Sequence, residues 1–253
     1  MTGVHLEGVS FGYSRRASPV LSDLTLRLAG PGSVGLLGPN GSGKTTLVKL
    51  LATVLTPERG WVEISGVRAD STQAVRNVRK GVGYLPQRFG YFKGFTAEEF
   101  VGYCLWIRGA PTPRGVIADA LDAVGMADLR GTRMGSFSGG QAQRVGIAQA
   151  IAGAPPLVIL DEPSAGLDPE QRIQMRTVLR GLVSSLVVMS THLIEDVIMT
   201  TNDVVVIHEG RIVHHGATRD LPGADRTGGN PPAGYSAAEG AYLQVLSRPG
   251  TRP

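Results

Sequence analysis

Cysteine is almost absent from the sequence, since Cys104 is the only one among 253 residues. A single thiol excludes an intrachain disulfide and a zinc site built from cysteines, and it is typical of a reducing compartment. Apolar runs long enough to cross a bilayer are also missing, as is a basic-then-apolar leader at the N-terminus. We therefore expect a soluble protein that reaches a membrane only through a partner.

Clustered positive charge is scarce as well. The net charge is +4, only four of the 25 basic residues are lysines, and no run of basic residues exceeds two. Such a mild and scattered excess argues against DNA or RNA as a partner. Hydrophobic residues make up 42% and charged residues 18% of the chain, which fits a globular protein with a sizeable core.

What the sequence does contain is a phosphate-loop pattern, G-x-x-x-x-G-K-[ST], at residues 38–45. An apolar run at 34–37 predicts a buried strand before it, and an apolar-periodic stretch at 47–55 predicts a helix after it. Glycines let the backbone curl around an anion, and the helix adds the positive end of its dipole. We expect Lys44 to reach the β- and γ-phosphates of a nucleotide and the Thr45 hydroxyl to ligate Mg²⁺. The predicted phosphate-binding residues are Gly38, Pro39, Asn40, Gly41, Ser42, Gly43, Lys44, Thr45 and Thr46.

Strand and helix patterns alternate along the chain, which argues for a mostly parallel sheet. The predicted strands cover residues 4–10, 21–28, 61–64, 81–87, 157–160, 185–190 and 203–207, and the predicted helices 115–124, 138–151, 170–182 and 193–199.

The stretch from 88 to 152 predicts a helical lobe set into this α/β body. A capping box from Thr96 to Glu99 starts one of its helices, on which Phe100, Tyr103 and Trp106 share a face. Beyond the body, residues 223–234 are rich in Gly, Pro, Asn and Thr and predict a linker, and a capping box at Ser236 predicts a short terminal helix.

Two carboxylates follow the apolar run at 157–160. In a phosphate-loop NTPase the first, Asp161, faces Mg²⁺, and the second, Glu162, is placed to accept a proton from the attacking water. The alternative is a pair of solvated acids at a strand end, which is common for an isolated Asp-Glu pair.

In the order and spacing of these motifs, the chain resembles the ATP-binding subunit of ABC transporters over nearly its whole length. Residues 137–141, Phe-Ser-Gly-Gly-Gln, are similar to the family's signature motif, with Phe in place of the usual Leu. Residues 164–168 match the loop after the catalytic strand. Gln87 matches the glutamine between core and lobe, His192 the switch histidine, and Tyr13 the aromatic residue that stacks on adenine.

The resemblance implies an α/β fold of the P-loop NTPase class. Its core is a RecA-like mixed or parallel sheet, with an N-terminal antiparallel β-subdomain and an inserted α-helical lobe. Residues 1–220 would form the ATP-binding domain, with the core at about 1–87 and 153–220, and residues 221–253 the linker and short helix.

It also implies roles for single residues. Glu162 would act as the base, His192 would bond the γ-phosphate and orient the water, and Tyr13 would stack on the base of the nucleotide. Gln87 would touch Mg²⁺ or its water at the lobe junction. The implied catalytic set is thus Lys44, Gln87, Glu162 and His192, and the implied metal set is Thr45, Gln87 and Asp161. Three alternatives stay open: Tyr13 as a core aromatic, Gln87 as a polar corner residue, and His192 as a structural histidine at a strand end. The histidines given structural roles are His5, His208, His214 and His215.

A second phosphate cradle is implied at a helix start, formed by Ser138, Gly139, Gly140 and Gln141. In the family this cradle closes on the ATP of another subunit, so two chains, identical or different, would sandwich two ATP molecules.

The aromatic segment after Gln87 is the expected contact to a separate transmembrane subunit, through Tyr91, Phe92 and Phe95. The alternative is that these three side chains fill the core of the lobe.

We expect ATP hydrolysis that drives transport, on the inner face of the cell membrane. The residues 83–87, Gly-Tyr-Leu-Pro-Gln, and the short C-terminal end look more like export-type subunits. Other readings are a soluble ATPase of the same type, for example in iron–sulfur cluster assembly, and a module that binds ATP without hydrolysing it. The sequence names no transported substrate.

Overall fold

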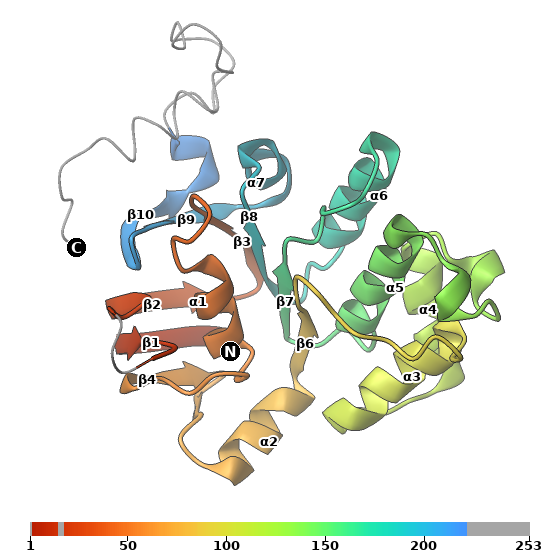
Figure 1. Cartoon of the computed structure of the whole chain (residues 1–253), viewed down its shortest axis with the longest axis horizontal. Helices are drawn as coiled ribbons and strands as arrows, with labels where there is room; N and C mark the ends of the chain where they lie inside the picture. Colours follow the sequence, from red (N-terminus) through yellow and green to blue (C-terminus); the bar gives the residue numbers. More distant parts are fainter. Residues whose placement is uncertain (1, 15–17, 222–253) are drawn as a thin grey trace, which may run out of the picture.

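The computed structural model describes residues 2–14 and 18–221. In that part of the chain two sheets lie side by side, and helices cover the larger one (Figure 1). The linker predicted at 223–234 and the helix predicted from Ser236 lie outside the described residues.

The smaller sheet is antiparallel and has the strand order β2-β1-β4-β5. Its strands are β1 (Gly3–Phe11), β2 (Leu21–Ala29), β4 (Arg59–Ile64) and β5 (Val67–Arg68). From Leu24 on, β2 alternates buried and exposed side chains, because one face of the sheet packs on the core and the other meets water. This sheet is the predicted N-terminal antiparallel subdomain.

The larger sheet has the strand order β10-β9-β3-β8-β7-β6. Its strands are β3 (Gly32–Leu37), β6 (Val82–Leu85), β7 (Leu157–Asp161), β8 (Leu186–Thr191), β9 (Asp203–His208) and β10 (Arg211–Ala217). Neighbouring strands are parallel except β10, which is antiparallel to β9. All five residues of β7 are buried, as the continuous apolar run predicts for a central parallel strand. The predicted mixed sheet is therefore confirmed.

The register brings the carboxyl ends of four strands to one edge. Leu37 pairs with Thr191, Asp161 with Ser190, and Leu85 with Leu160. The loops that follow β3, β6, β7 and β8 therefore leave the sheet together, which is where ligands bind in open α/β sheets.

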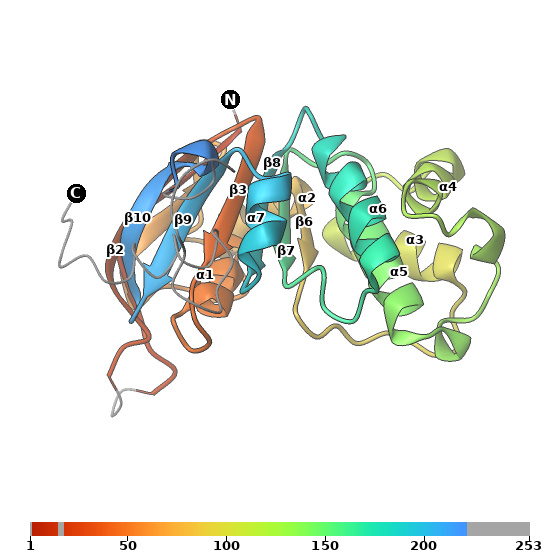
Figure 2. The ribbon, with the colours of Figure 1, turned by 90° about the horizontal axis from the view of Figure 1, so that it is seen from above.

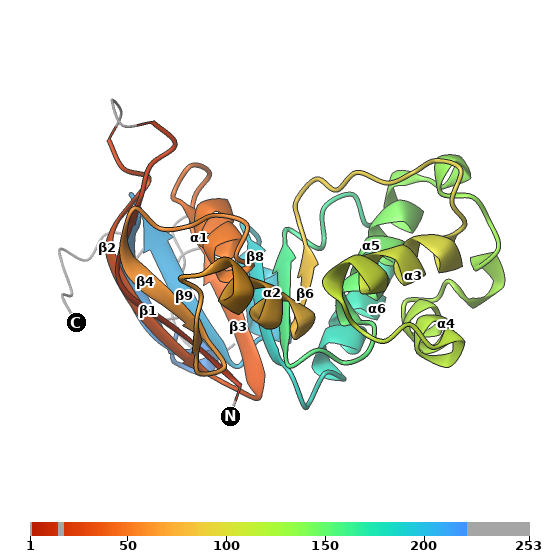
Figure 3. The same cartoon turned by 90° about the horizontal axis from the view of Figure 1, so that it is seen from below.

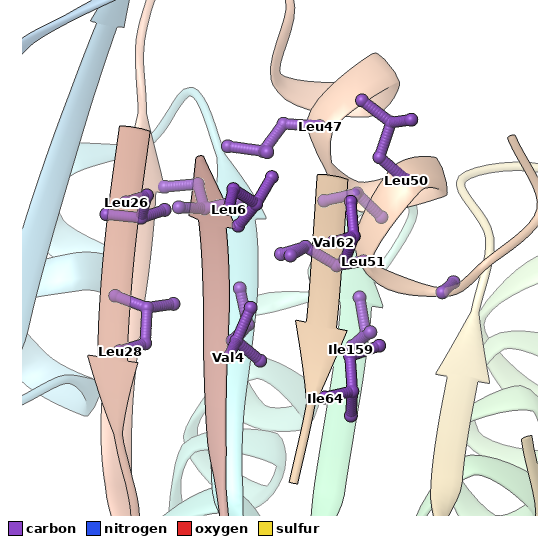
Figure 4. Packing of buried hydrophobic residues seen from close by; sticks show 14 of the residues in the cluster. Val4, Leu6, Leu26, Leu28, Leu47, Leu50, Leu51, Val62, Ile64 and Ile159 are labelled. Atoms are coloured by element: carbon purple, nitrogen blue, oxygen red, sulfur yellow. The ribbon is translucent and has the colours of Figure 1, made fainter. Parts of the chain in front are cut away.

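Side chains of the parallel strands feed two different cores. Leu157, Ile159 and Val188 belong to the core that contains α1 (Lys44–Leu51) and the antiparallel sheet. Val158 and Leu160, one residue along, belong to the core of the helical lobe. Figure 4 shows the first core, in which leucines of α1 lie among side chains of β1, β4 and β7.

The lobe contains α3 (Ala97–Arg108), α4 (Arg114–Ala123) and α5 (Gly139–Ile151), with short 3₁₀ turns at Ala127–Leu129 and Met134–Ser136. With α6 (Pro169–Arg180), these helices lie on the side of the larger sheet away from the antiparallel sheet (Figures 2 and 3). Capping boxes start both α3 and α5, as predicted. Among the residues described, no helix combines the length and the apolar character that crossing a membrane requires.

Some local predictions were wrong. The helix expected at 47–55 spans Lys44–Leu51, because it begins inside the phosphate loop and Thr53 has a left-handed backbone (φ 56°). The structure adds α2 (Thr72–Lys80), which was not predicted; its apolar side is limited to Ala74, Val75 and Val78, of which Val78 alone is buried. His214 and His215 lie in β10, a half-exposed strand at the sheet edge. The remaining elements are α7 (Ile194–Thr200) and a 3₁₀ turn at Thr218–Asp220.

The aromatic face expected on α3 is only partly buried. Phe100 is 4% exposed, whereas Trp106 is 69% exposed. Three residues of an α-helix turn through about 60° less than a full circle. Trp106 lies two such steps after Phe100, so its side chain points away from the core.

Candidate functional site

The phosphate loop joins the end of β3 to the start of α1, and its backbone has room for glycine alone at two points. A Cβ on Gly38 would lie 2.3 Å from the carbonyl oxygen of Ile207. Gly43 has a φ of +107°, a conformation that other residues rarely adopt. The glycine spacing of the motif therefore follows from the close approach of the loop to β9 and from the turn into α1.

Two buried polar groups in this loop are available to a ligand. Ser42 Oγ is buried and has no hydrogen-bond partner within the described residues. Lys44 is 7% exposed, and its Nζ donates to the carbonyl oxygens of Gly38 at 2.7 Å and Pro39 at 3.1 Å. Burial lowers the pKa of the Lys44 amine, while the negative charges of Glu162 and Asp161 act in the opposite direction. A phosphate group beside this lysine would relieve the cost of its burial.

Asp161, the last residue of β7, has one carboxylate oxygen occupied and one free. Oδ1 accepts hydrogen bonds from Thr45 Oγ1 at 3.3 Å and from Ser190 Oγ at 2.5 Å. Oδ2 is buried, and no hydrogen bond reaches it from the described residues. A buried carboxylate oxygen that accepts no hydrogen bond is suited to bind a hard cation such as Mg²⁺, or a water molecule bound to that cation. The described residues contain no cluster of three or more His, Cys, Asp or Glu that could cage a metal. A cation held by Asp161 and Thr45 would therefore need phosphate oxygens to complete its shell, as is usual for Mg²⁺.

Glu162 follows Asp161 and is paired with His192. Its Oε2 lies 2.9 Å from His192 Nδ1. The Glu162 side chain is 8% exposed and that of His192 55% exposed. Glu162 also has a left-handed backbone, with a φ of 53°, which is uncommon outside glycine and concentrates at functional sites. This pair places a shielded carboxylate and a solvent-facing imidazole at the same sheet edge.

Tyr13 is on the surface, so the alternative of a core aromatic is excluded. It is 60% exposed, its hydroxyl lies 3.3 Å from Thr46 Oγ1, and its ring meets Phe11 edge-on at 5.1 Å. The open face of the ring beside α1 could take a planar base.

Gln87 lies two residues beyond β6, at the same edge as the carboxylates, and it is exposed. Within the described residues its amide makes no hydrogen bond, which disfavours the alternative of a corner residue that satisfies backbone groups. No hydrogen bond joins its side chain to Asp161. Tyr84, on β6, is half-buried, and burial together with the charge of Asp161 raises its pKa to about 12.

The second predicted cradle is separate from the first. Ser138 caps α5 by accepting from the Gln141 amide at 3.2 Å, and Gln141 Oε1 accepts from the Ser138 amide at 2.9 Å. Ser138 and Gly139 are exposed. Figures 1, 2 and 3 place α1 and α5 in different halves of the molecule. One chain therefore brings residues 38–46 together with Asp161, Glu162 and His192, but leaves the start of α5 facing solvent.

One residue in the site was missed by sequence reasoning. Ser190 is fully buried and bonds both Asp161 and Glu162. The available signal was a polar residue near the end of an otherwise apolar strand.

The aromatic segment divides into a packed part and an exposed part. Tyr91 and Phe95 pack against the core of the lobe, and Tyr91 meets Phe100 edge-on at 6.4 Å between ring centroids. For these two residues the alternative reading, a role in the core, is the better one. Phe92 is 56% exposed and meets Tyr103 edge-on at 5.5 Å.

Comparisons with known proteins agree with this arrangement. The family model described as "ABC transporter" matches residues 21–165. The "Uncharacterized ABC transporter ATP-binding protein YxlF" of Bacillus subtilis is 34% identical over 197 residues, covering 77% of this chain and 64% of that protein. The "Methionine import ATP-binding protein MetN" of Caulobacter vibrioides is 32% identical over 225 residues, covering 86% and 68%. The chain thus spans about two thirds of the length of these relatives.

Solved structures of ABC proteins have a fold similar to that of this chain. A dimeric post-hydrolysis state of the ATP-binding cassette MJ0796, bound to ADP and Pi, has a TM-score of 0.78 at 25% identity, over 85% of this chain and 99% of that one. A bacterial Atm1-family ABC exporter with ATP bound has a TM-score of 0.79 at 25% identity, over 96% of this chain and 42% of that one. Since the family model covers more than half of the sequence, and the relatives and the fold agree with it, the chain belongs to the ABC transporter family, as one of its nucleotide-binding ATPase domains.

Proposed function

We propose that this chain binds and hydrolyses Mg·ATP to power an ABC transporter, as a dimer around two ATP molecules and through separate transmembrane subunits. It would work in the cytoplasm, peripherally on the inner face of the membrane. The observation that carries the proposal is the gathering of the phosphate loop, Asp161, and the Glu162–His192 pair at one sheet edge.

Binding of the phosphates would use the loop at 38–46. Its backbone amides and the N-terminus of α1 attract anions, and Lys44 would exchange the carbonyl oxygens of Gly38 and Pro39 for phosphate oxygens. The ring of Tyr13 would carry the base. Thr45 and Asp161 would hold Mg²⁺, with Gln87 reaching its shell from the lobe side. When bound, Mg²⁺ neutralises charge on the β- and γ-phosphates.

Hydrolysis would use the Glu162–His192 pair. The Glu162 carboxylate would accept a proton from the attacking water, and its buried setting keeps competing water away. Since Nδ1 of His192 faces Glu162, Nε2 is the ring nitrogen left to bond the γ-phosphate.

Dimerisation is supported by the position of the α5 N-terminus. Ser138 and Gly139 are exposed and lie in the half of the molecule away from the phosphate loop. A second chain, facing this one, could bring its own Ser138, Gly139, Gly140 and Gln141 to the nucleotide. The solved MJ0796 cassettes that resemble this chain are dimeric.

Docking to a membrane subunit would use Phe92, Tyr103 and Trp106. Their rings follow one another along the surface of the lobe, with centroids 5.5 Å and 6.1 Å apart, and Trp106 and Phe92 are exposed. Exposed aromatic groups of this kind mark partner contacts.

Our proposal takes export as the direction, on the similarity of residues 83–87 to export-type subunits. Relatives with import in their names support the other direction, whereas the Atm1-family structure is an exporter. Transport into or out of sealed vesicles that contain the membrane subunits separates the two.

The function is tested by phosphate release from ATP by the purified chain, with and without a chelator, followed by affinity purification from membranes. We expect Mg²⁺-dependent release and recovery of a multi-span membrane protein. Hydrolysis without any membrane partner would instead favour a soluble ATPase, such as one for iron–sulfur cluster assembly.

A further inference from the structure

Ser190 touches both carboxylate residues of the candidate site. It is the fifth residue of β8, is 0% exposed, and lies opposite Asp161 in the register of β7 and β8. Its Oγ donates to Asp161 Oδ1 at 2.5 Å and accepts from the Glu162 amide at 3.2 Å. One hydroxyl therefore joins a side chain to the backbone of its neighbour.

The bond to Asp161 decides which carboxylate oxygen remains free. Oδ1 is used by Ser190 and by Thr45, and Oδ2 is buried, with no partner among the described residues. Rotating the carboxylate would break both bonds to Oδ1, and a lost bond to a buried charged group is costly. The hydroxyl therefore helps to leave Oδ2 as the oxygen that is available to a cation.

The bond to Glu162 supports an unusual backbone. Glu162 has a φ of 53°, and its amide donates to both Ser190 O at 3.1 Å and Ser190 Oγ at 3.2 Å. This turn, held from β8, points the Glu162 side chain at His192. Groups behind a metal ligand or a base commonly fix its orientation in this way.

We propose that Ser190 is a positioning residue for the reaction, whose hydroxyl orients the Asp161 carboxylate toward the cation and holds the turn that aims Glu162 at its water. This inference rests on the proposed function, because it takes Mg²⁺ and ATP as the ligands. Ser190 itself touches neither.

The test compares Ser190→Ala and the nearly isosteric Ser190→Cys with Ser185→Ala. Ser185 is the matched control, because it is also a buried serine (1% exposed) whose hydroxyl is bonded, to Pro155 O at 2.8 Å, but it lies just before the start of β8, away from the carboxylates. The readouts are Mn²⁺ affinity in the presence of ADP by electron paramagnetic resonance, ADP affinity without metal by calorimetry, kcat and KM for ATP, and the melting temperature.

We expect Ser190→Ala to lower Mn²⁺ affinity or kcat by about 10–100-fold, the range for groups behind metal ligands, with metal-free ADP affinity unchanged. Ser190→Cys should lose a similar amount without loss of folding, since a thiol is a weak hydrogen-bond donor. Ser185→Ala should lower the melting temperature and leave metal affinity and kcat unchanged.

Wild-type Mn²⁺ affinity and kcat in both Ser190 variants would overturn the inference, as would equal losses in the Ser185 control. Failure of the proposed function looks different, since the wild-type chain would then show neither metal-dependent ADP binding nor phosphate release, and the inference would fall with it.

Discussion

His192 Nδ1 lies 2.9 Å from Glu162 Oε2, so the residue directly after β8 and the residue directly after β7 form one unit. Most of the Glu162 side chain is shielded, whereas His192 reaches solvent. The pair thus extends from a protected carboxylate to the open side from which a γ-phosphate would arrive.

The change from Glu162 to Gln should separate binding from hydrolysis. Glutamine keeps the size of the side chain and cannot accept the proton, so we expect kcat to fall by about 10²–10⁴-fold, the usual contribution of a positioned base. ATP affinity should stay within a few-fold, because the phosphate loop is intact. Steady-state phosphate release and calorimetry measure the two effects.

The same variant should accumulate as an ATP-bound dimer, which light scattering after gel filtration detects. His192→Gln is the companion variant, and it should also lose turnover. Turnover of Glu162→Gln near the wild-type rate would remove this residue from the role of base.

Tyr84 gives a prediction in alkaline solution. Its pKa is raised to about 12 in the folded chain by burial and by Asp161, whereas a tyrosine in the unfolded chain loses its proton near about pH 10. Between these values the unfolded state binds fewer protons, so the free energy of unfolding falls as the pH rises. The contribution is fully present below about pH 10 and is lost toward pH 12.

Tyr84→Phe should remove this part of the pH dependence. Urea unfolding at several pH values from 9 upward should give a shallower decline for the variant than for the wild-type chain. Parallel declines would contradict the shifted pKa.

Much of the site could be predicted because its residues carry strong local signals. The phosphate loop needs glycine at 38 and 43 for steric reasons, and the capping boxes at Thr96 and Ser138 are local hydrogen-bond patterns. The buried run at 157–160 is long enough to identify a central strand.

Other features depend on contacts between distant segments. The role of Ser190 follows from its register opposite Asp161, which the sequence does not contain. Helix α2 is mostly polar and buries only Val78, so its short apolar side of Ala74, Val75 and Val78 is a weak signal in the sequence. The burial of Tyr91 and Phe95 depends on how the lobe closes around Phe100.

Mixed dimers should reveal whether each ATP site uses two chains. The Lys44→Ala change disables the phosphate loop of the chain that carries it. The Ser138→Arg change blocks the cradle at residues 138–141, which that chain would offer to its partner. In a dimer of the two, both defects fall in one site and the other site is wholly wild-type. We expect each variant alone to be inactive and the mixture to recover up to half of the wild-type phosphate release.

Purification through two different affinity tags isolates the mixed dimers for this measurement. If Ser138→Arg alone keeps full activity, or if the mixed dimer is as inactive as each variant alone, the shared site is wrong.

Phe92 and Phe100 provide the contrast that tests the docking surface. Phe92 is 56% exposed on the surface of the lobe, so Phe92→Ala should change the free energy of unfolding by less than about 0.5 kcal/mol, as is usual at exposed positions. Phe100 is 4% exposed, and Phe100→Ala should cost about 3–5 kcal/mol, because it leaves a cavity in the core. Urea unfolding measures both changes.

If Phe92 contacts a membrane subunit, its loss should weaken that complex while the free chain hydrolyses ATP at the wild-type rate. Trp106→Ala should act in the same way, because Tyr103 links the two rings on one surface. The measurements are recovery of the membrane subunit in affinity purification and transport by vesicles that contain both proteins. Full recovery and transport with both variants would place the contact elsewhere on the chain. A large loss of stability in Phe92→Ala would show that its ring supports the lobe, because a side chain that serves only a partner contributes little to the folding of the free chain.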